Sequence, residues 1–294
     1  MDLDKLRVFH EAAAAGSFTR AGERLHLSQP SVSGHVRDLE RVLGVPLFER
    51  LGRGVRLTGP GAALYEYAKR IFALESDAES ELAAFRGAEA GEVTLAASST
   101  PGVYLLPPIL APFRAAHPGV KLAVHISDTG DVTRHLEDLS ADIGVVGAPI
   151  AGMENHAWRP DELVLVAGRD HPWRAAPPLN ARELDGSPFI SREAGSSVGE
   201  ATKQWLSDNG IRVDVVLTLE GTEAVKRAVA AGLGITITTS YALGSELETG
   251  ELAVVDVPGL PIRRNLYLSR DPRRPLVPAA RALWDALCDT SATG

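Results

Sequence analysis

Hydroxyl side chains gather in three segments of the sequence, and each segment comes just before a stretch with helical character. The segments are Ser98-Ser99-Thr100-Pro101, Asp128-Thr129-Gly130-Asp131 and Ser191–Ser197. Hydroxyls and free backbone N–H groups at the N-terminus of a helix bind anions. These segments are therefore candidates for holding a small anion, although each hydroxyl could equally be only a helix cap.

A second group of residues, near the N-terminus, could bind phosphate. Three arginines and no acid occur between Arg50 and Arg56. Lys and Arg side chains clustered in this way neutralise phosphates. Just before them, a predicted helix carries an apolar stripe, and its opposite face presents Pro30, Ser33, Gly34, Arg37 and Arg41. Arg37 and Arg41 could also form surface ion pairs with Glu40 and Asp38, and we expect His35 to be a packing residue.

Two familiar enzyme motifs are absent. The sequence has no Gly-x-x-x-x-Gly-Lys-Ser/Thr pattern and no His-Glu-x-x-His pattern. Its single cysteine, Cys288, excludes an internal disulfide and a multi-cysteine zinc site. We therefore predict that the protein is not an enzyme and uses no cofactor or metal, and a cytosolic ligand carrier is the second alternative.

The charge of the 294-residue chain is unevenly distributed. The net charge is −8, yet residues 1–86 hold 12 basic and 12 acidic side chains, so the whole excess lies in residues 87–294. An acidic whole-chain pI would argue against a nucleic-acid binder, but only local charge matters for phosphate contact. No segment has the roughly 20 apolar residues of a membrane span, and the acidic N-terminus does not resemble a signal peptide.

Residues 1–58 predict three short helices and a two-stranded wing. Gly16 should end the first helix, Ser17 or Thr19 should cap the second, and Ser28 should cap the third, with Pro30 in its first turn. The third helix carries its apolar stripe on Val32, Val36, Leu39 and Leu43. Three such helices followed by a basic hairpin are typical of a winged helix-turn-helix, whose third helix enters the major groove of DNA.

The stretch from Ala12 to Arg50 resembles the LysR-type transcriptional regulators, and the resemblance extends over the whole chain. It contains Ser17-Phe18, Ser28-Gln29-Pro30-Ser31-Val32-Ser33, Leu39-Glu40 and Leu47-Phe48-Glu49-Arg50 at the family's spacing. The resemblance implies that the DNA-binding residues are Gln29, Pro30, Ser31, Ser33, Arg37, Arg50 and Arg53.

Two departures from the family pattern occur in this region. Gly22 replaces the usual second alanine, which lowers helix propensity by roughly 1 kcal/mol. Gly34-His35 stands where the family often has a long polar residue followed by Gln. We expect fewer base contacts at Gly34 and a closer approach of the backbone to DNA.

Residues 59–88 predict one long linker helix that pairs with a second copy. Apolar residues follow alternating three- and four-residue steps, as in a helix that packs on another helix. An amphipathic helix packed on its own domain is the alternative. The predicted dimerisation residues are Leu64, Tyr67, Ile71, Leu74, Ala78 and Phe85.

Strand and helix patterns alternate from Glu92 onward, which predicts an α/β fold with mainly parallel sheets. The resemblance implies two lobes of the periplasmic-binding-protein type, with residues 91–163 and 266–294 in lobe I and 164–265 in lobe II. A cleft between the lobes would bring the hydroxyl segments together. The predicted effector-binding residues are Ser98, Ser99, Thr100, Thr129, Ser196, Ser197 and Thr222. The arginine that some relatives have shortly after Ser197 is missing, since Gly199 follows Val198.

These features predict a sequence-specific regulator of transcription that is controlled by a small, anionic effector. Its expected partners are double-stranded DNA with an interrupted inverted repeat, RNA polymerase, and further copies of itself as a homodimer or homotetramer. The expected location is the cytoplasm, with the protein on the nucleoid when bound to DNA. The Ser99–Pro107 block resembles regulators of sulfur assimilation and carbon fixation. The sequence leaves open the effector, the target genes, activation versus repression, and the size of the oligomer.

Overall fold

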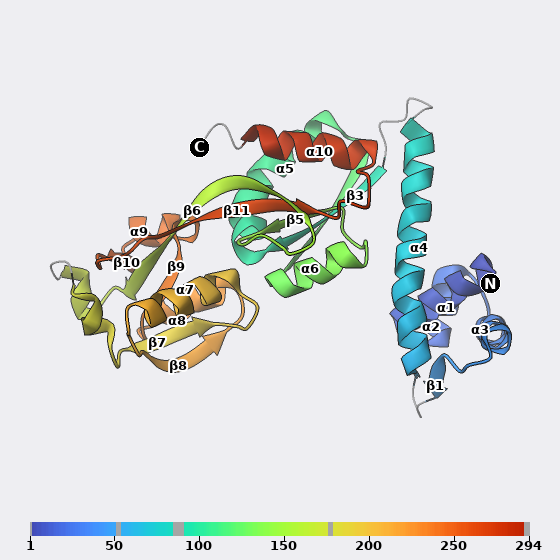
Figure 1. Ribbon diagram of the computed structural model, residues 1–294, viewed down its shortest axis with the longest axis horizontal. Helices are drawn as coiled ribbons and strands as arrows, with labels where there is room; N and C mark the ends of the chain where they lie inside the picture. Colours follow the sequence, from blue (N-terminus) through green and yellow to red (C-terminus); the bar gives the residue numbers. More distant parts are fainter. Residues whose placement is uncertain (1, 51–53, 85–90, 176–178, 291–294) are drawn as a thin grey trace. The chain divides into compact units, whose positions relative to one another are not determined.

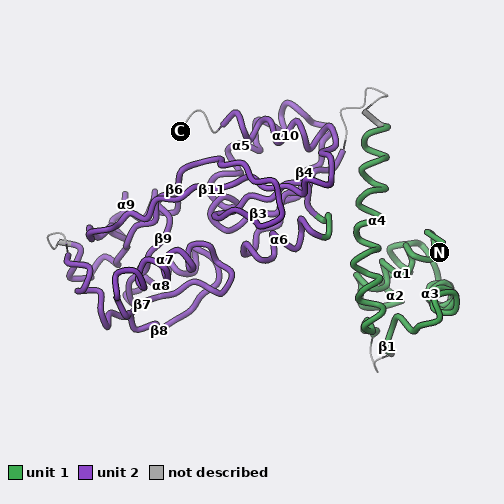
Figure 2. Tube along the Cα trace, in the orientation of Figure 1, with its two compact units in different colours: residues 1–82, 138–140 green, residues 83–137, 141–294 purple. Residues whose placement is uncertain are grey.

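A computed structural model describes residues 2–50, 54–84, 91–175 and 179–290. The chain forms two compact units (Figure 2), one from residues 1–82 and 138–140 and the other from residues 83–137 and 141–294. The first unit contains α1 (Leu3–Ala15), α2 (Phe18–Leu25), α3 (Gln29–Leu43), β1 (Phe48–Arg50), β2 (Val55–Leu57) and α4 (Gly59–Ala84).

The short helices of the first unit begin and end at the residues that the sequence indicates. Ser17 and Ser28 cap α2 and α3 by accepting the N–H groups of Arg20 and Ser31. Gly16 ends α1 with a φ of 60°, a left-handed conformation that favours glycine. On α3 the stripe residues Val32, Val36 and Leu39 are buried, whereas Leu43 is 37% exposed.

The wing and the long helix α4 are both attached to the three-helix core. Glu40 on α3 accepts the backbone N–H groups of Leu47 and Phe48, at 2.7 and 3.3 Å, and so fixes the start of β1. Thr58 accepts the N–H of Gly61 in the first turn of α4 and donates its hydroxyl to the Pro46 carbonyl. These bonds connect α3, the wing and the start of α4 to one another.

The second unit contains β3 (Gly91–Ser98), the π-helical turn η1 (Pro101–Leu105), α5 (Leu106–Ala116), β4 (Val120–Ser127), α6 (Thr129–Glu137), β5 (Ile143–Val146), β6 (Glu154–Gly168), η2 (Pro172–Ala175), η3 (Ala181–Leu184), β7 (Pro188–Arg192), α7 (Ser197–Asp208), β8 (Asp214–Leu219), α8 (Thr222–Ala230), β9 (Thr236–Thr239), η4 (Ser240–Ala242), α9 (Gly244–Glu248), β10 (Leu252–Val255), β11 (Ile262–Arg270) and α10 (Pro278–Asp289). Its largest sheet has the strand order β10-β6-β11-β5-β3-β4, with β9 also paired to β6, and β7 pairs with β8.

Helices cover both faces of the sheets, and the apolar residues form separate cores. In lobe I, the core of Val93, Leu95, Phe113 and Leu283 lies beneath α5 and α10, and α6 covers another core with Val132. In lobe II, α7 and α8 each cover a core of their own. This arrangement confirms the predicted fold class: a winged helix-turn-helix, a long helix and a two-lobed α/β half (Figure 1).

The sheets differ from the prediction in one respect, because many of their strand pairs are antiparallel. The long strands β6 and β11 pair with each other in antiparallel register from Leu163–Ile262 to Glu154–Arg270. One end of β11 pairs with β5 in lobe I, and one end of β6 pairs with β9 and β10 in lobe II. The sequence pattern showed only the apolar cores of these strands, because their other residues are polar and partly exposed.

Candidate functional sites

The N-terminus of α3 forms an accessible polar surface in the first unit. Gln29, Pro30 and Ser31 are all exposed in the first turn, where the hydroxyls of Ser28 and Ser31 lie 2.8 Å apart. Arg37 is exposed about two turns further along and donates from Nε to the Ser33 carbonyl at 3.1 Å. Four of the predicted DNA-binding residues are thus together on one accessible surface.

Ser33 and Arg41, which were predicted to lie on the same surface, are less available for contact with DNA. Ser33 is only 5% exposed, so its hydroxyl is poorly placed to contact a base. Arg41 forms an ion pair with Asp38, which was one of the two alternatives for this residue. Glu40 does not pair with Arg37 but holds the wing.

The wing presents fewer free charges than the sequence suggests. Arg56 on β2 pairs with Glu49 on β1 through Nε and Nη2, and this carboxylate raises the pKa of Arg56. Arg50 is the last residue of β1, and Arg53 lies outside the described residues. Both arginines remain predictions as DNA contacts.

The predicted dimerisation residues lie on two faces of α4. Leu64 and Ile71 pack against the core of their own unit around Leu6, Phe9 and Ala68. Tyr67 and Leu74 are 64% and 51% exposed, and Ala78 is exposed as well. Leu82, which the prediction did not include, is 62% exposed and continues this stripe, while Phe85 lies outside the described residues.

In the second unit, the hydroxyl segments meet as predicted in a small polar pocket between the lobes. Six of the seven predicted effector residues line it, namely Ser98, Ser99, Thr100, Thr129, Ser196 and Ser197. They come from the end of β3 and the start of η1, from the start of α6, and from the start of α7. Thr222, the seventh, lines the adjoining outer cleft.

The helix caps in this pocket differ in part from the expected ones. Ser196 caps α7 by accepting the Gly199 N–H, as its position suggests. Thr100 makes no capping bond, because its backbone is already helical before the π-helical turn. The N–H of Asp131 in α6 is accepted by Asp128, so the hydroxyl of Thr129 is not used as a cap and has no hydrogen-bond partner in the described structure.

Arg192 is the cation of this pocket, and the prediction did not include it. Its side chain is buried and donates to Thr222 Oγ1 at 2.9 Å and to Ser99 Oγ at 3.4 Å. It also makes two 2.7 Å bonds to Glu193. Burial raises the pKa of Glu193, but the bonds and charge of Arg192 lower it overall. The signal in the sequence was the Arg192-Glu193 pair itself, beside the hydroxyls.

A second, largely buried arginine, Arg264 on β11, contacts one of the residues that line the pocket. It donates to Ser197 Oγ at 3.2 Å and pairs with the buried Asp161 at 2.8 Å. Burial lowers the pKa of Arg264, and Asp161 offsets part of this effect. The start of α7 is thereby connected to the paired strands β6 and β11.

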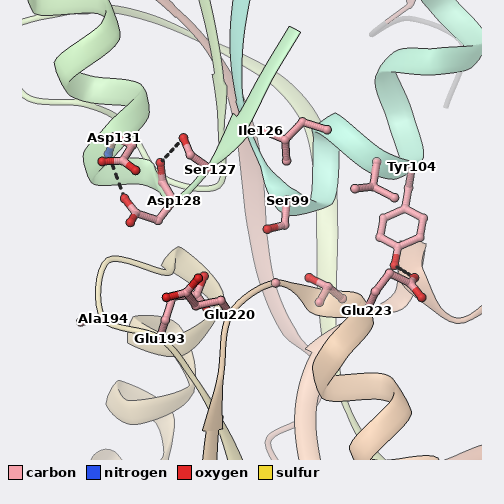
Figure 3. A pocket seen from close by; sticks show the side chains of 13 residues that line it. Ser99, Tyr104, Ile126, Ser127, Asp128, Asp131, Glu193, Ala194, Glu220 and Glu223 are labelled. Atoms are coloured by element: carbon pink, nitrogen blue, oxygen red, sulfur yellow. Dashed lines mark hydrogen bonds between the residues drawn. The ribbon is translucent and has the colours of Figure 1, made fainter. Parts of the chain in front are cut away.

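The outer cleft has a volume of about 660 Å³, and five of its thirteen lining residues are acidic (Figure 3). Asp128 and Asp131 lie on one side, and Glu193, Glu220 and Glu223 lie on the other. Such a volume falls within the usual range for small-molecule sites. The cleft therefore has a small inner end lined by hydroxyls, Arg192 and Asp128, and a wide outer end with four further carboxylates.

A hydrogen bond joins the two lobes across this outer cleft. Tyr104 on η1 donates its hydroxyl to Glu223 on α8 (Figure 3). Glu223 pairs in turn with the buried Lys226, which also pairs with Glu246 at 2.6 Å. Burial, followed by the bond to Glu223, raises the pKa of Tyr104 well above its ordinary value, so the phenol remains a donor.

These two parts together, a helix-turn-helix with a wing and a two-lobed α/β half with a polar cleft, define a ligand-responsive transcriptional regulator. Residues 3–62 match the family "Bacterial regulatory helix-turn-helix protein, lysR family", and residues 86–292 match the "LysR substrate binding domain". The chain belongs to the LysR family of transcriptional regulators, as the sequence resemblance indicated.

Relatives of known role are similar in sequence to nearly the whole of this chain. A RuBisCO operon transcriptional regulator of Allochromatium vinosum is 34% identical over 99% of this chain and 97% of its own length. The regulator CfxR of Cupriavidus necator is 37% identical over 96% of this chain and 89% of its own. The protein is therefore a regulator and not an enzyme, and these relatives match the carbon-fixation branch that the sequence resemblance indicated.

Solved structures support the same fold. The regulatory domain of Synechocystis CcmR in complex with 2-PG has a TM-score of 0.65 and 26% identity, covering 68% of this chain and 97% of that one. Full-length CbnR complexed with its target DNA has a TM-score of 0.72 and 22% identity, covering 99% of this chain and 100% of that one. Within the described residues, no helix is long and apolar enough to cross a membrane.

Proposed function

We propose that the inner pocket binds the anionic group of a small metabolite and that binding changes how the protein controls promoters for carbon fixation. The observation that carries this proposal is the convergence of six hydroxyl residues with Arg192 at the inner end of the cleft. Support comes from CcmR, whose regulatory domain binds 2-PG, and from the relatives that regulate RuBisCO operons.

The carboxylates of the outer cleft restrict the class of effector. Five acidic side chains would repel an anion that extended its charge toward the mouth. The effector is therefore compact, with its negative charge confined to the inner end and any remaining part neutral or hydroxylated. Its anion competes with Glu193 for Arg192 and gains the hydroxyls of Ser99 and Thr222.

DNA binding is assigned to α3, through Gln29, Pro30, Ser31 and Arg37, together with Arg50 and Arg53 of the wing. Two recognition helices are needed for an interrupted inverted repeat, so the active form is a dimer or a tetramer. The exposed stripe of Tyr67, Leu74, Ala78 and Leu82 on α4 supplies the pairing surface. We further propose that the protein works in the cytoplasm on the nucleoid and contacts RNA polymerase.

The effector proposal is tested by titrating the purified protein with 2-PG and with inorganic phosphate in a calorimeter. Saturable binding of either probe is expected, and Arg192→Gln should weaken it at least tenfold. Lys121→Gln is the matched control, since Lys121 is an exposed cation on β4. Equal binding by Arg192→Gln and the wild type would exclude the inner pocket.

The DNA proposal is tested by footprinting the region upstream of the gene, with and without 2-PG. A protected inverted repeat is expected, with an extent or bend that changes when the effector binds. Gln29→Ala should remove the protection while leaving the melting temperature unchanged. A carrier without promoter function would protect no site.

A further inference from the structure

Within the described part of the chain, Asp128 is the only carboxylate among the residues that line the inner pocket. It follows β4 and lines the outer cleft as well, so it lies where the two spaces meet. The rest of the inner wall consists of hydroxyl residues, Arg192 and Val198. An anion at the inner end would therefore lie beside one group of its own charge.

The carboxylate of Asp128 is held from both lobes. Its Oδ1 accepts the N–H of Asp131 at 2.8 Å, as in a helix cap (Figure 3). A Cβ on Gly195, in the loop before α7, would lie 3.1 Å from the Asp128 Cγ, so this loop packs directly against the carboxylate. The other oxygen, Oδ2, makes no hydrogen bond within the described residues and is accessible at the surface of the cleft. A carboxylate oxygen in this position can only accept a hydrogen bond.

Two hydroxyls of the same pocket are arranged as donors. Ser99 Oγ accepts a hydrogen bond from Arg192 at 3.4 Å, and Ser197 Oγ accepts one from Arg264 at 3.2 Å. A hydroxyl that accepts a bond from a guanidinium keeps its own hydrogen to donate. The inner pocket therefore offers donors to an anion on one side and a carboxylate that can only accept on the other.

This combination distinguishes between oxyanions that differ only in a proton. Hydrogen phosphate and sulfate are both tetrahedral dianions, but hydrogen phosphate keeps one O–H and sulfate has none. The O–H of hydrogen phosphate would donate to Asp128 Oδ2, while its other oxygens accept from the hydroxyls. Sulfate would place an unprotonated oxygen against the carboxylate, where the like charges repel and no hydrogen bond forms.

We propose that Asp128 makes the inner pocket selective for an oxyanion that retains a proton, either hydrogen phosphate or a singly protonated phosphoryl group, and excludes sulfate. The proposal rests on the proposed function, because the anion of the effector must bind at the inner end. It adds the residue that sets the specificity and the chemical feature that this residue recognises.

Calorimetric titration of the full-length protein with inorganic phosphate and with sulfate tests the proposal, at a pH at which both anions are dianions. The wild type should bind phosphate roughly a hundredfold more tightly, because a site built to pair with an O–H rejects an analogue that lacks it. Asp128→Asn should bind the two anions with affinities within about threefold of each other, because its NH₂ group donates to either anion. Its amide oxygen can still accept the Asp131 N–H, so the melting temperature should be unchanged.

Asp131→Asn is the matched control. Asp131 lines the outer cleft and pairs with Arg134, so this variant removes the same charge and leaves the residues of the inner pocket as they are. It should keep the preference of the wild type for phosphate. A preference that is lost in this variant as well would show that charge alone decides, and it would overturn the proposal.

The remaining outcomes separate this proposal from the proposed function. Equal binding of phosphate and sulfate by the wild type, or an unchanged preference in Asp128→Asn, would overturn the role of Asp128 and leave the pocket as an anion site. Binding of 2-PG without binding of either inorganic anion would also overturn only the role of Asp128, because the pocket would not recognise the isolated oxyanion. Binding of none of the three probes would count against the proposed function itself, and the specificity would fall with it.

Discussion

Two glycines of the DNA-binding unit look alike in sequence but lie in different surroundings. A Cβ on Gly22 would lie 2.5 Å from the carbonyl oxygen of Leu27, whereas a Cβ on Gly34 would have no atom within 4 Å. The sequence suggested that Gly22 only weakens α2. The structure explains why position 22 is a glycine, because the turn between α2 and α3 passes too close to it for a side chain.

The two alanine substitutions should therefore change stability in opposite directions. Gly34→Ala should raise the free energy of unfolding by up to about 1 kcal/mol, through helix propensity alone. Gly22→Ala should lower it, because the backbone of Leu27 would have to move. Urea unfolding of the two variants measures both effects, and a stabilised Gly22→Ala would show that the turn adapts at no cost.

Lys226 is a buried charge whose removal should affect both stability and its pH dependence. Its side chain is 4% exposed and pairs with Glu223 and Glu246. Burial raises the pKa of each glutamate, but the bond to Lys226 lowers both overall. Lys226→Met should lower the free energy of unfolding by about 3 kcal/mol, as expected for a broken buried pair.

The pH dependence follows from the direction of these shifts. A carboxyl whose folded pKa is below its ordinary 4.5 stabilises the fold above pH 4.5, and this stabilisation is lost as the pH falls through the folded pKa. The wild type should therefore lose stability on acidification below about pH 4.5. Lys226→Met should show a shallower acid limb in thermal melts, and an identical limb would contradict the pairing. Lys203→Met, which removes an exposed pair, is the control.

At the scale of single elements, α4 shows how one helix serves two surfaces. Leu64 and Ile71 belong to the core of their own unit, while Tyr67, Leu74 and Leu82 form an exposed stripe. The sequence pattern contained both sets and could not separate them, because steps of three and four residues occur on each face. Packing on its own domain, one of the two alternatives for this helix, is thus seen for Leu64 and Ile71, while pairing with a second copy stays a prediction.

A charge on the exposed stripe should prevent self-association without unfolding the chain. Leu74→Glu should shift the sedimentation coefficient toward that of a monomer and weaken DNA binding at the same time. Ser76→Glu is the control, since Ser76 is exposed but lies away from the stripe. An unchanged oligomer in Leu74→Glu would assign self-association to another surface.

The sequence predicted helices more accurately than it predicted the pairing of strands. Helix ends were marked by local signals such as Ser28 and Gly16, which act within one turn. The direction of β6 and β11 depends on partners about one hundred residues away, and no local signal encodes it. The same reason explains how much of the polar pocket could be predicted. Its hydroxyl residues were predicted because they stand at the starts of helices. The place of Arg192 in the pocket was not predicted, because it depends on the end of β7 lying close to Ser99, which follows β3.

At the scale of the whole molecule, the net negative charge lies entirely in residues 87–294. The chain carries −8, but the residues predicted to bind DNA belong to a segment of zero net charge. Negative charge on residues 87–294 should oppose nonspecific contact of that half with DNA, since like charges repel. The acidic pI of the whole chain therefore argued wrongly against DNA binding, whereas the net charge of residues 1–86 is compatible with it.

The bond from Tyr104 to Glu223 should set how firmly the two lobes are held together. Tyr104→Phe should keep the fold but weaken effector binding by about fivefold, equivalent to about 1 kcal/mol, because closure loses a hydrogen bond. Calorimetry with 2-PG measures the affinity, and hydrogen exchange in β6 and β11 reports opening. Tyr267→Phe in lobe I is the control, and equal affinities for all three proteins would mean that this bond does not contribute to closure.

The pairing of Pro160 with Asn265 has a consequence for how such regulators acquire new ligands. Between the lobe I core, which holds Trp158 and Leu266, and the lobe II core, which holds Leu163, the outgoing and returning strands lie side by side, roughly 5 Å apart as in any antiparallel pair. The segment between them is thus an insertion with adjoining ends, which recombination can exchange as a single cassette. Replacing it leaves the promoter-recognition end of the molecule untouched, so new sensing can be combined with an old operator in one genetic event.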